Sequence, residues 1–344
     1  MPDGETPLVC ICIPTYNAGA TLGETLASVV AQSHQRLDIL IVDNASTDDT
    51  VAVARNFDDP RIRIHENAEN IGAEGNFNRC IALAGGDYTA IFHADDVYLP
   101  EMVAEQVAFL ERHPAAGGVL TEAVVIDEQG AETGAISLPV ELRTAGGAGL
   151  GFPDLFRAVL RHSNFLICPS AMVRTAVYKN DIRRWRGELF GSSADLDIWF
   201  RIALRSQIGV LPMKLMKYRV GDAQFSSSVR RQTAQADFFR VMDYYLARDE
   251  GRAAVTAADL ENYRKLLRRD TAMRAANLFL NGEFQQSASL LNELRSSALI
   301  RSAVSDERSF IVLLLVAYLK AANRPALRQP GQAFLRFLRR ILQK

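Results

Sequence analysis

Two neighbouring carboxylates offer the clearest chemistry in this sequence. Asp95 and Asp96 directly follow the apolar run Tyr88 to Phe92. Adjacent desolvated carboxylates raise each other's pKa unless a cation joins them. Two protein oxygens are few, which suits Mn²⁺ or Mg²⁺, ions that keep waters and take further ligands from substrate phosphates. The pair therefore predicts a divalent metal site with a diphosphate as its missing ligand.

A simpler interpretation of Asp95 and Asp96 is a solvated turn before a helix, whose N-terminal dipole favours acids. Their position favours the metal site, because the apolar run before them reads as a buried strand and ligands bind where such strands end. His93, just before the pair, is either a hydrogen-bonding neighbour or a further ligand.

A third carboxylate, Asp195, begins a predicted helix. Asp197 follows at i+2, so only one of the two acids can face a site. An acid at this place can also serve only to stabilise the helix dipole. We expect Asp197 to lie in solvent or in an ion pair, and Trp199 and Phe200 to belong to the core.

Short apolar runs alternate with helical patterns through the first hundred residues. The predicted strands are residues 8–13, 39–42, 61–64 and 88–92. This alternation predicts an α/β fold with a mostly parallel sheet flanked by helices. Ligands bind beyond the carboxyl ends of such strands. The polar residues that follow the strands are Thr15-Tyr16-Asn17, Asp43-Asn44 and Asp95-Asp96.

The length of 344 residues exceeds one compact domain. Strands are predicted at residues 119–126 and 208–211, but strand patterns vanish after Ala234. We therefore expect domain 1-228 to hold the sheet and domain 229-344 to be α-helical, with a helical hairpin at Asn281-Gly282. The apolar run at residues 310–319 is about half the roughly 20 residues of a membrane span and predicts a buried helix.

Composition narrows the class of protein. The 39 Lys and Arg residues nearly cancel 40 Asp and Glu residues, for a net charge of -1, which argues against a nucleic acid partner. The N-terminus MPDGETP is not a signal peptide, so a cytoplasmic location is expected. The four cysteines lack metal-site spacing and predict buried, reduced thiols; they are Cys10, Cys12, Cys80 and Cys168.

The last stretch of the chain is basic and amphipathic, with no acid after Glu307. Such a segment can lie on the anionic face of a membrane, and the alternative is a solvated helix packed on its own domain. Its basic residues are Lys320, Arg324, Arg328, Arg336, Arg339, Arg340 and Lys344. The apolar residues among them are Phe334, Leu335, Phe337, Leu338, Ile341 and Leu342.

Several motifs in fixed order resemble the family 2 glycosyltransferases of the GT-A fold. They are Val9 to Asn17, Ser28 to Ser33, Ile41 to Asp48, Asn70-Ile71-Gly72 and Asp95 to Pro100, and the resemblance extends over roughly residues 7–228. The segment Ala194 to Arg201 is similar to the family's helix whose leading acid is the catalytic base. The resemblance implies that Asp195 is this base and that Asp96 is the direct metal ligand.

The resemblance also implies a nucleotide-sugar pocket. The expected binding residues are Pro14, Thr15, Tyr16, Asn17, Asp43, Asn44, Gly72, Asn76 and Asp95. Three positions depart from the family pattern. Asn44 stands where many members have Asp, Ala194 where Glu is common and Gly221 where His is common, for which Asp222 or Gln224 could substitute.

These features predict an inverting, metal-dependent glycosyltransferase. Its expected donor is a nucleotide-diphosphate sugar, most readily a UDP-sugar, and its acceptor a glycan or lipid-linked sugar in cell-surface glycan synthesis. A peripheral contact at the inner face of the cell membrane is expected. The alternatives are a non-catalytic nucleotide-sugar-binding or scaffold protein, and a nucleotidyltransferase, whose usual Gly-rich basic loop the stretch Pro14 to Ala20 lacks.

Overall fold

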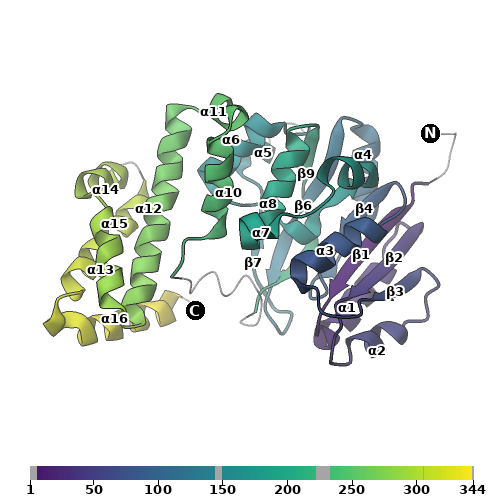
Figure 1. Ribbon diagram of the computed structural model, residues 1–344, viewed down its shortest axis with the longest axis horizontal. Coiled ribbons are helices and arrows are strands. Elements are labelled where there is room, and N and C mark those ends of the chain that lie inside the picture. The colour runs from purple at the N-terminus through teal and green to yellow at the C-terminus, as the bar shows by residue number, and fades with distance from the viewer. Residues whose placement is uncertain (1–5, 144–148, 222–232, 305, 343–344) are drawn as a thin grey trace. The chain divides into compact units, whose positions relative to one another are not determined.

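The computed structural model describes residues 6–143, 149–221, 233–304 and 306–342 (Figure 1). The chain divides into two compact units, Met1–Gly221 and Asp222–Lys344. The expected domain boundary after Ser228 lies outside the described residues, as do Asp222 and Gln224.

A nine-stranded sheet forms the centre of the first unit. Its strands are β1 Val9–Thr15, β2 Leu37–Asp43, β3 Ile62–Glu66, β4 Tyr88–Ile91, β5 Val97–Tyr98, β6 Ala116–Ile126, β7 Glu132–Ile136, β8 Met172–Arg174 and β9 Gln207–Arg219. The strand order is β3-β2-β1-β4-β8-β6-β9-β5, with β7 beside β6. Strands β3, β2, β1 and β4 are parallel, whereas β8 is antiparallel to both β4 and β6.

Helices flank this sheet, and the predicted fold class is confirmed. They are α1 Gly19–Val30, α2 Thr50–Arg55, α3 Gly72–Leu83, α4 Met102–Arg112, α5 Val140–Arg143, α6 Phe152–His162, α7 Gly187–Phe190 and α8 Ala194–Ala203, with short turns η1 Cys168–Ser170, η2 Val177–Ile182 and η3 Gly191–Ser193. Strand β1 is buried on both faces, since Val9 to Ile13 are fully inaccessible. On α1, Leu22, Leu26 and Val29 repeat at helical spacing and are buried.

The second unit is helical, as the sequence predicts. Its elements are α10 Asp237–Leu246, α11 Asp249–Ala254, α12 Ala257–Leu280, α13 Phe284–Glu293, α14 Ser296–Ala303, α15 Glu307–Ala322, η4 Pro325–Leu327 and α16 Arg328–Leu342. The predicted hairpin joins α12 to α13, and Gly282 there has a φ of 87°, a value that glycine adopts without strain.

The prediction of a buried helix over residues 310–319 is wrong for one of its faces. Helix α15 buries Val316 and Leu319, but Phe310, Ile311 and Leu314 are about half exposed. The sequence run is apolar all round, so its composition cannot reveal which face is covered. Among the described helices none alone has the length and hydropathy of a membrane span, and residues 307–322 and 325–340 meet that test only as a pair bent by 111°.

Phe200 anchors α8 to α6, since its ring meets Phe152 and Phe156 edge to face at 5.7 and 5.3 Å. The side chain is fully buried. We expect Phe200→Ala to lower the free energy of unfolding by about 3–5 kcal/mol because it leaves a cavity. Leu204→Ala, at the exposed end of the same helix, should cost about 1 kcal/mol or less. Chemical denaturation measures both, and equal losses would contradict this role.

Candidate active site

The ends of β1 and β2 are held together by one buried carboxylate. Thr15 pairs with Asp43 in the parallel register, and Thr15 Oγ1 donates to Asp43 Oδ1 at 2.9 Å. The Ser46 amide donates to Asp43 Oδ2 at 2.9 Å, and the Ser46 hydroxyl donates to Oδ1 at 2.6 Å. Asp43 is 2% exposed. Its oxygens therefore shape the loop that follows β2.

The loop after β1 presents the exposed side chains at this strand end. Tyr16 is 51% exposed, Asn17 is exposed and Pro14 is partly buried. Asn17 has a φ of 49°, which asparagine tolerates better than most residues. The backbone amide of Asn17 donates to Ser46 Oγ, and the side-chain Oδ1 of Asn17 accepts from the backbone amide of Thr47, both at 2.9 Å. The Tyr16 ring is therefore held on a fixed turn and remains accessible for stacking.

Asn44 and Asn76 are buried and bonded to the protein itself. The side-chain amide of Asn44 donates to Asn70 Oδ1 at 2.8 Å and to the Gly72 carbonyl at 3.3 Å. The side-chain amide of Asn76 donates to the Val42 carbonyl at 2.9 Å. These bonds fix the start of α3, where Gly72 has a φ of 75°. Both asparagines hold the loop around the expected pocket.

Asp96 combines full burial with one unpartnered oxygen. Its Oδ1 accepts the backbone N–H of Arg219 at 2.8 Å. Its Oδ2 has no hydrogen-bond partner among the described residues and lies 4.0 Å from Nδ1 of His93. One potential ligand atom each from His93, Asp95 and Asp96 lies within 4.8 Å of the others. The structure thus groups the two predicted metal ligands with His93.

The electrostatics of this group suit a cation. Burial raises the pKa of Asp96 well above its usual value, and the charge of Asp95 raises it further. Burial also lowers the pKa of His93, so its imidazole is neutral at neutral pH. A desolvated carboxylate oxygen without a donor and a neutral imidazole form a donor set that fits a divalent metal ion.

Helix α1 connects the loop after β1 to the turn after β4 that carries Asp95 and Asp96, which we call the acid turn. Thr21 Oγ1 donates to the Ala94 carbonyl at 2.9 Å, and Thr25 Oγ1 donates to the Asp96 carbonyl at 2.8 Å. Since α1 begins at Gly19, just past Tyr16, these bonds tie the turn after β4 to the element that leaves the β1 loop. The expected nucleotide and metal residues therefore share one edge of the sheet.

Arg219, the last residue of β9, bonds the turn that carries Asp95 and Asp96. Its Nε donates to the Asp95 carbonyl at 2.8 Å, its Nη1 to the Asp127 carbonyl at 3.2 Å and its Nη2 to Glu24 Oε2 at 2.5 Å. The residue is 6% exposed. These partners lie far along the chain, so no local sequence pattern around Arg219 indicates them. Beside it, the Glu128 side chain occupies the space that a Cβ at Gly221 would need.

Asp195 lies in the first turn of α8 and is partly exposed. Burial of the carboxyl raises its pKa from 3.8 to about 6, opposed by hydrogen bonds from the amides of Leu196 and Asp195 and from the Asn164 side chain. No local sequence pattern indicates that Asn164 bonds Asp195, because the two residues are 31 positions apart. A carboxyl with this pKa can accept a proton near neutral pH.

Asp197 has a different environment, which confirms the expected ion pair. It is fully buried, bonded to Arg186 and, at 2.9 Å, to Nε of Arg201. Trp199 and Phe200 are core residues, also as predicted. Of the two acids on α8, Asp195 is thus the one with solvent access.

Cys168 lies near both Asp195 and Asp96. Burial raises the pKa of this thiol, and the charges of Asp195 and Asp96 raise it further. Both carboxylates are therefore near the start of η1. Nothing in the local sequence distinguishes Cys168 from the three other free cysteines, which are buried.

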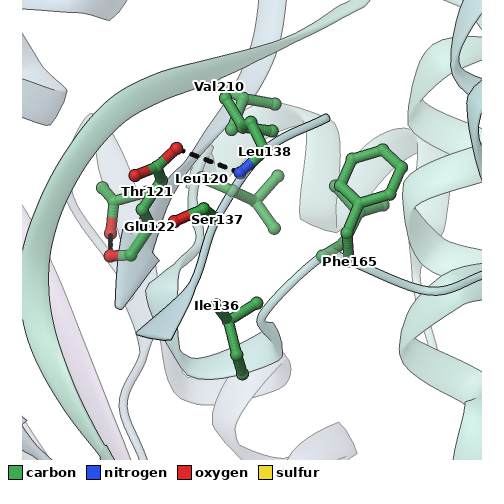
Figure 2. A pocket seen from close by; sticks show the side chains of 9 residues that line it. Leu120, Thr121, Glu122, Ile136, Ser137, Leu138, Phe165 and Val210 are labelled. Atoms are coloured by element: carbon green, nitrogen blue, oxygen red, sulfur yellow. Dashed lines mark hydrogen bonds between the residues drawn. The ribbon is translucent and has the colours of Figure 1, made fainter. Parts of the chain in front are cut away.

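A recess between β6, β9 and the segment after Asn164 contains about 190 Å³ of space between atoms (Figure 2). It is too narrow for a water molecule. The Leu138 amide donates to Glu122 Oε1 across it at 3.0 Å. We interpret the recess as a packing gap. It is lined by Leu120, Thr121, Glu122, Ile136, Ser137, Leu138, Phe165, Leu166 and Val210.

Residues 10–181, half of the chain, match the model of glycosyl transferase family 2. The chain therefore belongs to this family, and the expected resemblance is confirmed. Among its relatives is the putative glycosyltransferase EpsE of Bacillus subtilis, 32% identical over 198 residues. That match covers 57% of this chain and 66% of EpsE.

Two solved structures share the fold. One is Staphylococcus aureus TarS 1-349 in complex with UDP-GlcNAc, with a TM-score of 0.60, 18% identity and coverage of 96% of this chain and 92% of the other. The second is the mannosyltransferase PcManGT of Pyrobaculum calidifontis in complex with GDP-Man and Mn²⁺, with a TM-score of 0.55, 17% identity and coverage of 92% and 86%. At these identities the likeness concerns the fold.

The raised pKa of Asp195 predicts a measurable cost to stability. A carboxyl whose folded pKa exceeds its unfolded value penalises the folded state fully above the folded pKa and not at all below the unfolded one. We expect Asp195→Asn to raise the free energy of unfolding by about 2–3 kcal/mol at pH 7.5, and the gain to vanish as the pH falls from about 6 to about 4.

Denaturation midpoints of the two proteins across this pH range measure the effect. Asp49→Asn, at an exposed position of the same unit, is the matched control and should show no such pH-dependent gain. Equal stability of Asp195→Asn and the unsubstituted protein at every pH would contradict the desolvation of Asp195.

Proposed function

We propose that the protein is an inverting, metal-dependent glycosyltransferase that moves a sugar from a nucleotide-diphosphate sugar to a hydroxyl group. The observation that carries the proposal is the arrangement around Asp96. This buried carboxylate has an unpartnered oxygen beside Asp95 and His93, and the Cys168 thiol, whose pKa is raised by the charges of Asp96 and Asp195, lies near both acids. Family membership supports the transfer of a sugar.

The loop after β1 is suited to hold the nucleotide. The exposed Tyr16 ring can stack on a base, while Asp43 and Asn17 fix the turn that carries it. A UDP-sugar is the proposed donor, supported by the UDP-GlcNAc complex of a protein with the same fold. Mn²⁺ or Mg²⁺ held by Asp96 and Asp95 would offset the negative charge of the departing diphosphate.

Asp195 performs the proton transfer in this proposal. Its carboxylate accepts the proton of the acceptor hydroxyl, whose oxygen bonds to the anomeric carbon as the bond from that carbon to the diphosphate oxygen breaks. One displacement inverts the anomeric configuration, and no covalent sugar intermediate forms. The buried ion pairs of Asp197 hold α8, and thereby Asp195, in place.

The acceptor is proposed to be a glycan or a lipid-linked sugar of cell-surface glycan synthesis, elongated on the cytoplasmic side at the inner face of the cell membrane. The basic and apolar C-terminal helix of the second unit supports this assignment, because such helices meet anionic surfaces.

Replacement of the base separates catalysis from binding. We expect Asp195→Asn to lower the transfer rate by about 10²–10⁴-fold, since the proton acceptor is lost, while the affinity for UDP with Mn²⁺ stays within about twofold. In the unsubstituted enzyme kcat/KM should rise with pH up to about 6 and then level off, because the ionised carboxylate is the active form. Release of nucleoside diphosphate from a panel of nucleotide sugars measures turnover.

Full activity of Asp195→Asn would remove Asp195 from this role. Donor binding without turnover by the unsubstituted protein, over the whole panel, would favour the non-catalytic binding protein.

The metal role of Asp96 has its own test. We expect Asp96→Asn to weaken Mn²⁺ binding in the presence of UDP by about tenfold or more, because the amide keeps the shape but removes the charge. Electron paramagnetic resonance of free Mn²⁺ measures the affinity directly, without turnover. Asp49→Asn serves as the control of equal charge change, and unchanged Mn²⁺ affinity in Asp96→Asn would refute the site.

A further inference from the structure

Large apolar side chains of the second unit gather on two adjacent helices. On α15, Phe310, Ile311 and Leu314 are 49%, 56% and 54% exposed. On α16, Phe334 and Phe337 are 47% and 58% exposed. Grouped exposure of this kind marks a surface that meets a partner, whereas single exposed side chains are ordinary.

The two sets form one surface. Ile311, Leu314 and Tyr318 share a face of α15, because they are spaced by three and four residues. The Tyr318 ring lies 5.4 Å from the Phe334 ring, and the Tyr318 hydroxyl donates to the Gly331 carbonyl at 2.9 Å. The stripe on α15 therefore continues onto α16. We call the α15–α16 patch the set Phe310, Ile311, Leu314, Tyr318, Phe334 and Phe337.

Helix α16 has three faces with distinct environments. Leu335 is buried in the core of the helical unit. Phe334 and Phe337 face outward at the patch, and Arg336 and Arg340 are exposed on a third side. The core contact of Leu335 stabilises the helix, and Phe334 adds its ring contact with Tyr318 while remaining half exposed. The exposure of Phe334 and Phe337 costs solvation free energy that a partner surface would recover.

Cations outnumber acids along the patch, although Glu307 is exposed one turn before Phe310 and Ile311. Lys320 in the last turn of α15 and Arg324 just after it are exposed, and no Asp or Glu follows Glu307 in the sequence. The patch is thus an apolar surface bordered by cations from the last turn of α15 onward. A second copy of this chain is a poor match, because a symmetric contact would bring the same cations together.

We propose that the α15–α16 patch docks the protein on the surface of a bilayer that contains anionic phospholipids. The aromatic and aliphatic side chains enter the boundary between headgroups and acyl chains, and the flanking arginines pair with lipid phosphates. Because Leu335 remains packed in the protein core, α16 lies flat on the bilayer. The patch belongs to the second unit, so its test does not depend on the transfer reaction.

Flotation of the full chain with phosphatidylcholine vesicles, with and without phosphatidylglycerol, tests the proposal. We expect the chain to bind vesicles with phosphatidylglycerol about tenfold more than vesicles without it, and we expect high salt to reduce this binding. Phe334→Ser with Phe337→Ser should lower this binding about tenfold, and Arg336→Gln with Arg340→Gln should lower it and remove its salt dependence.

Matched controls use exposed positions near α14. Ile300→Ser with Val304→Ser removes equally exposed apolar side chains, and Arg295→Gln with Arg301→Gln removes the same charge. Both control pairs should bind vesicles as the unsubstituted chain does. The proposal is overturned if the unsubstituted chain does not bind anionic vesicles, or if the control pairs lose as much vesicle binding as the patch variants. It is also overturned if light scattering shows a dimer that only the phenylalanine substitutions disrupt. Unchanged release of nucleoside diphosphate by the patch variants would separate docking from catalysis.

Discussion

The arrangement of this site depends on a carboxylate that has been removed from water and only half satisfied. Asp96 is fully buried, and a single backbone N–H, from Arg219, bonds one of its oxygens. An ionised carboxylate in such a place is unfavourable unless a further positive group reaches it. The protein supplies no donor to the other oxygen among its described residues. That constraint is the physical basis of the proposed metal site.

The remaining structure can be understood as the means of keeping this turn in place. Strand β4 ends just before Asp95 and Asp96 at the sheet edge. On α1, Thr21 donates to the Ala94 carbonyl and Thr25 donates to the Asp96 carbonyl. Arg219 closes the turn from β9 with a guanidinium that is nearly inaccessible. Because these contacts come from separate strands and helices, the site is rigid without any disulfide. Rigid placement is what selective binding of a small ion requires.

Sequence patterns were sufficient to locate the strands β1 to β4. Strands β1, β2 and β4 are apolar because a parallel sheet is covered on both faces, whereas the edge strand β3 alternates half-buried isoleucines with the exposed Arg63. The same patterns marked the acids at the strand ends. They understated β9, which the sequence suggested as residues 208–211 and which runs from Gln207 to Arg219. Its second half carries Lys214 and Lys217, and a strand with charged side chains lacks the apolar run that would have revealed it. Likewise, the apolar residues 310–319 do not encode which side of α15 the protein covers.

The sequence by itself determined the chemistry available to this protein: adjacent acids after a buried strand, a lone acid opening a helix, and a basic C-terminal segment. These follow from residue type and local spacing, which the chain carries unfolded. Only the tertiary structure decided that Asp195 and Asp96 lie near one thiol, that Asn44 and Asn76 bond to the protein and that Arg219 bonds the turn of Asp95 and Asp96. Burial and hydrogen bonding between distant residues set these roles, and neither property belongs to any short stretch of sequence.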